Sequence, residues 1–389
     1  MQKTTWIHTT IIVIIKKELS KKNNERSFLM TKQLIVRGAP QEYELKTKAW
    51  DSLQMHLNRR NIENVLILHG EASWKAVKTY FPELSITKTF HYYGGQCTDA
   101  AAEEFASLCK EKAFDGIIAV GGGKVADLGK FAAYKAQLPI IILPTLAATC
   151  AAYTPLSVVY NEAGVMLRYD IFPKASDLVL IDPAIILESP RPLMIAGIGD
   201  TLAKWYESRA IISQLSVKPV EVQVAEFAAK QCRQILLEKS EAALHAMEQG
   251  QINQAFIDVV EANILLAGMV GGFGDEYGRT AGAHSIHDAL TVLPESHQQL
   301  HGNKVAYGIL VQLMIEDNQT EIQQLLPFYH QLNLPTSLEA MNLYLTEEDY
   351  QAVAERACTP GEMIHLMKET ITPELIIQKM KALEVRMKG

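Results

Sequence analysis

The 389-residue sequence has no excess of positive charge, because 37 Lys and Arg stand against 44 Asp and Glu, a formal net charge of -7. Nucleic acid would therefore meet no summed positive field, and a small-molecule partner is the better expectation. The five cysteines are odd in number, widely spaced and form no CxxC pair. This pattern argues against a zinc knuckle or a redox motif and fits a reducing cytoplasm.

A membrane-spanning run is also missing near the N-terminus. The apolar segment at residues 6–15 falls well short of the roughly 20 residues that a spanning helix needs, and no small-residue cleavage site follows it. We therefore expect no membrane insertion and no export, and a cytoplasmic location. A cleaner strand-and-turn pattern begins at Met30, so residues 1–29 are expected to be a poorly ordered extension.

Short apolar, β-branched runs alternate with helical stretches in the first half of the chain. Strands separated by helices predict a mostly parallel sheet. The runs IIAV and IIIL are apolar throughout, as strands covered on both faces should be. The predicted strands are residues 33–36, 64–69, 87–92, 116–120, 139–143 and 177–181.

The second half carries helical spacing without intervening strand runs. A chain of this length exceeds what one core usually holds, so two domains are expected. The boundary is placed near residues 182–192, where DPAIILESPRP combines proline with a helix start. We predict an α/β domain over residues 30–188 and an all-α domain over residues 189–389. The predicted helices of the latter include 193–215, 217–237, 252–269, 302–315 and 374–387.

A glycine-rich turn follows the predicted strand at 116–120, in the sequence VGGGKVAD. Glycines let the chain turn tightly, and the free amides of the helix that begins near Lys124 favour a phosphate. Asp127 is placed to hydrogen-bond loop amides or a ribose. A triple glycine after a strand is a plain tight turn about as often as it is a phosphate-binding turn. This sequence also lacks the GxGxxG pattern of a standard dinucleotide-binding turn. The phosphate-binding interpretation is strengthened by the strand at 139–143, which leads into the polar, small-residue segment PTLAATCAAYTPLSVVY at the same edge of the sheet.

Histidines cluster in the second half, where four of the 11 fall within 18 residues: His284, His287, His297 and His301. Asp200 lies early in the amphipathic helix MIAGIGDTLAKWYESRA. One carboxylate and two imidazoles, with an open position, suit catalytic Zn²⁺ or Fe²⁺. On spacing alone, Asp200 can instead complement a helix dipole, and the histidines can be core or loop residues.

Five motifs in order resemble the iron-containing alcohol dehydrogenase superfamily in its glycerol dehydrogenase-like branch: GGGKVAD, PTLAATCAAYTPLSVVY, AGIGDTLAKWYE, GAHSIHDAL and LHGNKVAYG. The resemblance covers the chain from Met30 on. It implies a Rossmann-like dinucleotide-binding domain followed by an all-α domain, the dehydroquinate synthase-like architecture. It further implies a homo-oligomeric, NAD(P)H-dependent and metal-assisted dehydrogenase.

The resemblance also assigns the site residues. Asp200, His284 and His301 hold the metal, with His287 and His297 beside them. The residues expected to bind the cofactor pyrophosphate are Gly122, Gly123, Lys124 and Asp127. Those expected on the nicotinamide side are Thr145, Ala148, Thr154, Leu156 and Tyr160. NAD-preferring members carry an acid after the strand at 64–69, where this chain reads His69-Gly70-Glu71, so NADP is a candidate beside NAD.

Two departures bear on the substrate. Cys150 stands where glycerol dehydrogenases carry an aspartate that contacts the polyol, and Lys204 stands where long-chain members have a further histidine. The motifs look most similar to bacterial hydroxycarboxylate dehydrogenases, which implies reduction of small 2-oxo acids to 2-hydroxy acids. Lys204 or Arg168 would supply the cation for the substrate carboxylate.

The implied mechanism has the metal, Zn²⁺ in preference to Fe²⁺, polarise a carbonyl oxygen while hydride passes between substrate and nicotinamide. A water-mediated proton relay through His287 is a further hypothesis. Three alternatives stay open: a polyol dehydrogenase, a dehydroquinate synthase-like lyase, and a catalytically silent nucleotide-binding protein. A dehydroquinate synthase-like lyase typically has a glutamate as its first metal ligand and several Lys and Arg near the site for a phosphate substrate. This sequence has Asp200 and few such cations.

Overall fold

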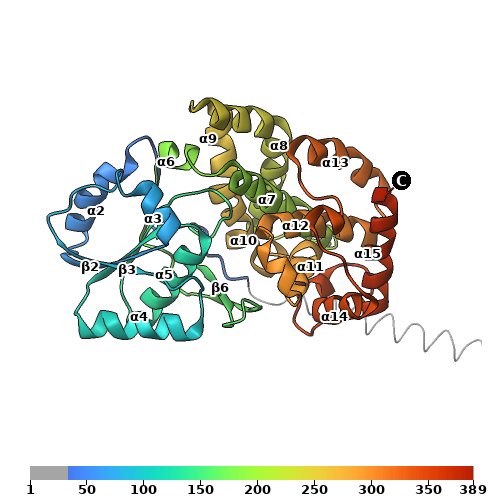
Figure 1. Cartoon of the computed structure of the whole chain (residues 1–389), viewed down its shortest axis with the longest axis horizontal. Coiled ribbons are helices and arrows are strands. Elements are labelled where there is room, and N and C mark those ends of the chain that lie inside the picture. Colours follow the sequence, from blue (N-terminus) through green and yellow to red (C-terminus); the bar gives the residue numbers. More distant parts are fainter. Residues whose placement is uncertain (1–33, 389) are drawn as a thin grey trace, which may run out of the picture. The chain divides into compact units, whose positions relative to one another are not determined.

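The computed structural model describes residues 34–388 (Figure 1). By its contacts the chain divides into Met1–Ile35 and Val36–Gly389, and only the second unit is described below. The expected extension over residues 1–29 and the apolar run at 6–15 lie outside the described residues. The predicted domain boundary at residues 188–189 falls within the second unit and stays a prediction.

Six parallel strands form one sheet in the described part of the chain. In sheet order they are β1 (Tyr43–Leu45), β8 (Leu178–Ile181), β5 (Ile140–Pro144), β4 (Gly116–Gly121), β2 (Asn64–His69) and β3 (Thr87–Tyr92). β2 and β4 are neighbours, but the chain leaves β2 toward β3 and leaves β4 toward β5. Such a switch point is where open α/β sheets bind ligands, outside the carboxyl ends of the strands.

Both faces of the sheet are covered by helices, as the continuous apolar runs predicted. Val65, Ile67, Ile118 and Val120 share one core with the helices that follow β1 and β2. Figure 1 shows α2 and α3 on this face and α4 and α5 on the other. The helices are η1 (Ala49–Ser52), α2 (Leu53–Arg59), α3 (Glu71–Val77), α4 (Asp99–Glu111) and α5 (Gly123–Ala136).

Five of the six predicted strands are present, each within a residue of its expected bounds. The run at 33–36 is wrong in its described part, because residues 34–36 are outside any strand and Ile35 is 52% exposed. The first strand is instead the three-residue β1, which is too short to give an alternating pattern. The segment after β5 is not all loop, since it contains an antiparallel hairpin of β6 (Leu156–Tyr160) and β7 (Met166–Ile171).

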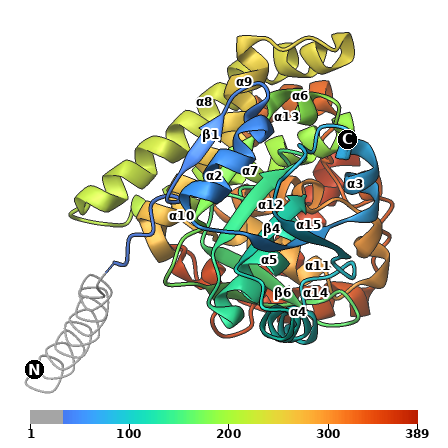
Figure 2. The same cartoon turned by 90° about the vertical axis from the view of Figure 1, so that its left-hand side faces the viewer.

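The rest of the described chain is helical, as predicted. The central helix, α7, is buried along most of its length and packs against α8, α10, α11 and α12. Figure 2 shows the long α8 most clearly. The helices are α6 (Pro183–Leu187), α7 (Arg191–Ile212), α8 (Val220–Gln249), α9 (Gln254–Glu261), α10 (Ala267–Gly274), α11 (Gly282–Leu290), α12 (His301–Ile315), α13 (Gln319–Leu332), α14 (Glu347–Ala357) and α15 (Pro373–Lys388).

Short helical turns connect several of these helices. One of them, the π-helical η2 (Ala262–Leu266), joins α9 to α10 without a break. The 3-10 turns are η3 (Asp275–Tyr277), η4 (Pro294–Gln298), η5 (Glu339–Met341) and η6 (Met363–Leu366).

The continuous segment Gln254–Tyr277 is apolar and long enough to cross a membrane by length and composition alone. Most of its apolar window is buried inside the protein, with Phe256, Val259 and Val260 fully inaccessible. Burial of this kind is typical of a core helix of a packed protein. Its composition therefore reflects packing against α7 and α8.

Candidate active site

The glycine turn lies at the carboxyl end of β4, at the switch point of the sheet. Gly122 is the extended N-cap residue of α5, and the helix begins at Gly123, one residue before the predicted start. A Cβ atom added to Gly123 would lie 3.0 Å from Thr149 Oγ1, and the Thr145 amide donates to the Gly121 carbonyl at 3.2 Å. The two predicted cofactor segments therefore lie side by side.

Asp127 lies in the second turn of α5, where it is buried. Its carboxylate accepts the N–H of Val158, in the middle of β6, at 3.2 Å, so its backbone partner is a strand amide and not the expected loop amide. Lys130, one turn further, forms an ion pair with Asp127 at 2.9 Å. Burial raises the pKa of Asp127, while Lys130 opposes that rise.

Lys130 also fixes the loop between β5 and β6, a role that the sequence analysis did not foresee. Its buried ammonium donates to the carbonyls of Ala151 at 2.6 Å, Thr154 at 3.0 Å and Leu156. The Asp127–Lys130 spacing in an otherwise small and apolar helix was the available signal. The loop path is thus set by a buried charge contacting backbone oxygens.

The residues assigned to the nicotinamide side line this loop and the strand after it. Thr145 follows β5, Ala148 and Cys150 lie in the loop, Thr154 precedes β6, and Leu156 and Tyr160 begin and end β6. Lys124 is exposed in the first turn of α5, with its Nζ 5.4 Å from the centroid of the Tyr160 ring.

The three expected metal ligands converge, although three separate helices carry them. Asp200 lies on α7, His284 on α11, and His301 is the first residue of α12. Each offers one ligand atom, and these atoms lie within 4.8 Å of one another. Asp200 Oδ1 is 3.1 Å from His284 Nε2 and 3.3 Å from His301 Nε2. Two nitrogens aimed at one oxygen leave a compact space for a cation.

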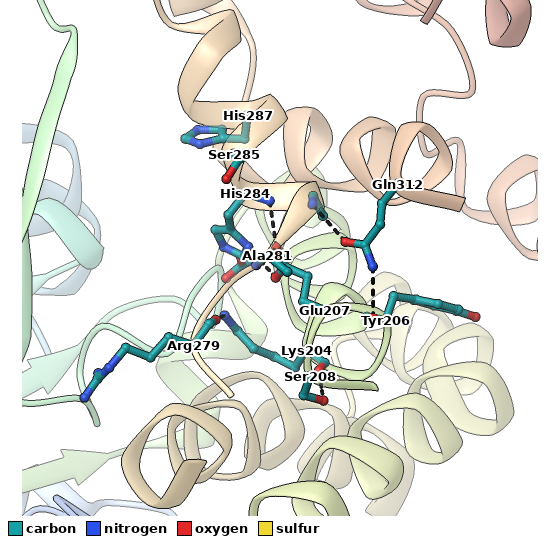
Figure 3. A network of polar contacts seen from close by, with 12 residues as sticks. Lys204, Tyr206, Glu207, Ser208, Arg279, Ala281, His284, Ser285, His287 and Gln312 are labelled. Carbon is teal, nitrogen blue, oxygen red and sulfur yellow. Dashed lines mark hydrogen bonds and ion pairs between the residues drawn. The ribbon is translucent and has the colours of Figure 1, made fainter. Parts of the chain in front are cut away.

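Glu207 holds His284 in this orientation, as Figure 3 shows. Its fully buried carboxylate accepts the Ala281 N–H at 2.7 Å and the His284 N–H at 2.8 Å. Its other oxygen lies 2.7 Å from His284 Nδ1. The ring therefore donates through Nδ1 and presents Nε2 toward Asp200, the arrangement common among metal-ligating histidines. Glu207 follows Asp200 by two helical turns, a spacing that could have identified it.

His301 is oriented by a second chain of contacts. His301 Nδ1 lies 2.9 Å from His287 Nε2, and His287 Nδ1 lies 2.8 Å from Asp288 Oδ1. The Tyr169 hydroxyl donates to the other Asp288 oxygen at 2.8 Å. His287 therefore donates to Asp288 and accepts from His301, which leaves His301 Nε2 directed at Asp200. The predicted neighbour role of His287 matches a direct contact, and no water is needed between the two rings.

The cluster is strongly polarised. Burial would raise the pKa of Asp200, but hydrogen bonds from His284 and His301 outweigh burial and hold that pKa well below its usual range. Burial would lower the pKa of His284, but Glu207 and Asp200 raise it to about 9. Burial, with repulsion from His301, holds the pKa of His287 well below its usual value. Metal ligands bind in deprotonated form, so a divalent cation at this point would take the place of the proton that His284 shares with Asp200.

The other predicted residues take different positions. Lys204, one turn after Asp200, is buried and donates to the Arg279 carbonyl at 2.9 Å. Arg168 is exposed and paired with Asp99 at 2.7 Å and Asp170 at 2.8 Å, so its charge is already matched on the surface.

Two further predicted residues are not among the three converging ligands. Cys150 is partly buried against an apolar cluster that includes Ala229, Cys232 and Val270. Burial raises the pKa of the Cys150 thiol, so it lies in its protonated form. His297 Nε2 lies 2.8 Å from the Thr291 carbonyl.

Close backbone contacts bring the helices to the sheet edge. A Cβ atom on Gly302 would lie 1.7 Å from the Ala196 carbonyl oxygen, and one on Gly197 would lie 2.2 Å from the Ala147 carbonyl oxygen. Asn263, in the π-helical turn η2, donates to the same Ala147 oxygen at 2.9 Å. Glycine is therefore required where α12 meets α7 and where α7 meets the loop after β5.

The chain is similar to known proteins over most of its length. The family model described as iron-containing alcohol dehydrogenase matches residues 40–183. Hydroxycarboxylate dehydrogenase A of Escherichia coli (strain K12) is 37% identical over 348 residues, which cover 89% of this chain and 96% of that protein. The chain belongs to the iron-containing alcohol dehydrogenase family.

Other members of the family are similar over much of their length. A glycerol dehydrogenase of Thermotoga maritima is 36% identical over 295 residues, 75% of this chain and 80% of that protein. The crystal structure of a probable glycerol dehydrogenase from Sinorhizobium meliloti 1021 superposes with a TM-score of 0.83 at 30% identity, covering 92% of this chain and 99% of that one.

Membership of the iron-containing alcohol dehydrogenase family confirms the predicted resemblance, fold class and enzyme class. The chain is an oxidoreductase that acts on hydroxyl groups of small molecules. Enzymes of this family use NAD(H) and a divalent metal. The roles of the individual site residues, the cytoplasmic location and the homo-oligomer stay predictions.

Proposed function

We propose that this protein reduces small 2-oxo acids to 2-hydroxy acids with NADH or NADPH, assisted by one divalent metal ion. The observation that carries the proposal is the convergence of Asp200, His284 and His301 from three helices. Gly197, on the same helix as Asp200, contacts the loop after β5. A metal-ligand set and a phosphate-binding turn thus belong to one site.

The donor set fits a catalytic metal. Two imidazole nitrogens lie 3.1 and 3.3 Å from one carboxylate oxygen, a separation compatible with ligand bonds of about 2.0–2.2 Å to one Zn²⁺. Three protein ligands leave an open position, which favours Zn²⁺ with Fe²⁺ as the alternative. When bound, the metal acts as a Lewis acid on the oxygen of the reacting carbonyl.

The chain's own residues perform the remaining tasks. Glu207 and His287 fix the ring orientations of His284 and His301. Gly122, Gly123 and Lys124 provide amides and a cation for the cofactor pyrophosphate. Thr145 through Tyr160 line the nicotinamide side, and Lys130 holds that loop in place. The relay from His301 through His287 to Asp288 offers a path for a proton.

The substrate preference rests on Cys150. A protonated thiol offers a polyol neither the charge nor the two acceptors of the aspartate that glycerol dehydrogenases have in this segment. A 2-oxo acid requires a cation for its carboxylate, a role for which the sequence offered Lys204 or Arg168. The similarity to a hydroxycarboxylate dehydrogenase supports this choice, while the similarity to glycerol dehydrogenases makes a polyol dehydrogenase the second candidate.

Purified protein should be assayed against 2-oxobutanoate, 2-oxoglutarate, glycolaldehyde and glycerol, with each cofactor, before and after chelation. We expect the highest kcat/KM for a 2-oxo acid, and its loss on chelation with recovery on adding Zn²⁺. A preference for glycerol would refute the substrate assignment while leaving the dehydrogenase class intact.

A further inference from the structure

Three lysines are buried in the described part of the chain: Lys130, Lys204 and Lys304. Lys130 is paired with Asp127 at 2.9 Å. Lys204 is surrounded by negative charge, because Asp200 and Glu207 overcome the effect of burial and raise its pKa. Burying a cation is unfavourable unless such partners offset the cost. These two lysines meet that requirement within the protein.

Lys304 does not. It is 5% exposed, and its ammonium donates only to the Ser296 carbonyl, at 3.2 Å, with no ion-pair partner among residues 34–388. An ammonium has three donors, so two have no partner within the described chain. Burial lowers the pKa of Lys304 to about 8, although the Asp288 charge opposes this shift, and repulsion from Lys124 adds to it. The folded protein therefore holds a cation where it is disfavoured.

The position of Lys304 identifies what would offset that cost. Lys304 follows His301 by three residues on α12, so both side chains lie on one face of the helix. Its charge acts on His287, which contacts His301, and is itself repelled by Lys124 of the cofactor turn. Lys304 is thus one helical turn from a metal ligand and close enough to Lys124 of the cofactor turn for their charges to interact, and we expect the substrate to bind between these two regions.

We propose that Lys304 binds the carboxylate of the 2-oxo acid substrate, an inference that rests on the function proposed above. Its two remaining N–H donors match the two oxygens of one carboxylate, in charge-assisted hydrogen bonds. The predicted cation Lys204 donates to the Arg279 carbonyl and is stabilised by the charges of Asp200 and Glu207, and Arg168 is paired on the surface. Lys304 is therefore the buried lysine whose charge is left for a ligand.

The test compares Lys304→Met and Lys304→Gln with wild type, using 2-oxobutanoate and the neutral carbonyl glycolaldehyde. Loss of one or two charge-assisted bonds should lower the ratio of kcat/KM values, oxo acid over aldehyde, by roughly 30-fold or more, mainly through KM for the oxo acid. Lys304→Arg should restore part of the ratio. Lys135→Met is the control, because the Lys135 ammonium is half-buried and already paired with Glu103, and this variant should leave the ratio at the wild-type value.

A measurement without turnover separates the substrate carboxylate from the cofactor phosphates. NADH binding, followed by fluorescence titration, should weaken in Lys124→Met and keep its wild-type Kd in Lys304→Met. Oxamate, an unreactive 2-oxo acid analogue, should raise the Tm of the NADH complex in wild type and less in Lys304→Met. A weakened NADH Kd in Lys304→Met with an unchanged substrate ratio would overturn the proposal in favour of a phosphate partner.

Stability provides a second check that a purely structural lysine would fail. Removing a buried cation that lacks a partner should leave the Tm of the ligand-free protein equal or higher in Lys304→Met. A large fall in Tm would show that Lys304 is structural. If wild type reduces 2-oxo acids and the Lys304 variants keep the substrate ratio, only this inference fails. If wild type reduces no 2-oxo acid, the proposed function fails with it.

Discussion

The glycine turn and the metal cluster reach their geometry by opposite routes. The turn consists of neighbouring residues, which run from Gly121 at the end of β4 to Asp127 in the second turn of α5. In the cluster, by contrast, Asp200 and His284 are 84 positions apart. The turn depends on local backbone conformation, whereas the cluster depends on how three helices pack. A substitution that disturbs helix packing should therefore impair the metal site and spare the cofactor turn.

Asp200→Ala should give the largest difference between the two regions, because it should impair the metal cluster and leave the glycine turn unaffected. Loss of the carboxylate removes the charge that both histidines contact, and we expect kcat/KM to fall by about 10³-fold or more, since metal polarisation contributes several kcal/mol. Chelation of the wild type should have the same effect. NADH binding by fluorescence should remain at its wild-type Kd, and full activity without bound metal would exclude the metal-assisted mechanism.

Gly302→Ala tests the packing on which the cluster depends. Its Cβ atom would lie 1.7 Å from the Ala196 carbonyl oxygen, so α12 must shift away from α7 and carry His301 with it. We expect a loss of stability of about 2–4 kcal/mol, as for overpacked cores, with weaker Zn²⁺ binding in the folded fraction. The neighbouring Asn303→Ala is the control. Equal Tm values for the two variants would contradict the close contact.

Glu207→Gln alters the support of one ligand and leaves all three ligands in place. The amide keeps an oxygen for the backbone N–H groups but loses the charge opposite His284 Nδ1. Zn²⁺ affinity should fall about 10- to 100-fold, the usual cost of removing such an outer partner. Competition with a fluorescent chelator measures this change. An unaltered affinity would mean that Glu207 serves only the backbone of α11.

The smallest effect should appear at the cofactor end. Glu71 is exposed in the first turn of α3, directly after Gly70 at the carboxyl end of β2. Its charge disfavours a 2′-phosphate, so Glu71→Gln should raise the NADPH-to-NADH ratio of kcat/KM by about threefold, in line with screened surface charges. An unchanged ratio would place the ribose away from α3.

The difference between the two regions also explains what the sequence could predict. Strand, glycines and helix start follow one another along the chain, so β4, Gly123 and α5 were located to within a residue. The metal ligands were grouped through a family resemblance, because spacing alone cannot place Asp200 beside His284. Glu207, Asp288 and Lys130 were missed, since their partners are fixed only by tertiary packing. The short β1 was missed for lack of any periodic signal.

Lys130 has a consequence for how this site can change. It holds the loop after β5 through the carbonyls of Ala151, Thr154 and Leu156, and every residue type supplies a carbonyl. The course of the loop is therefore independent of which side chains it displays. A position such as Cys150 is free to exchange aspartate for a thiol while the backbone keeps its path. One buried ammonium thus lets the side chains of this loop vary while the backbone keeps its course.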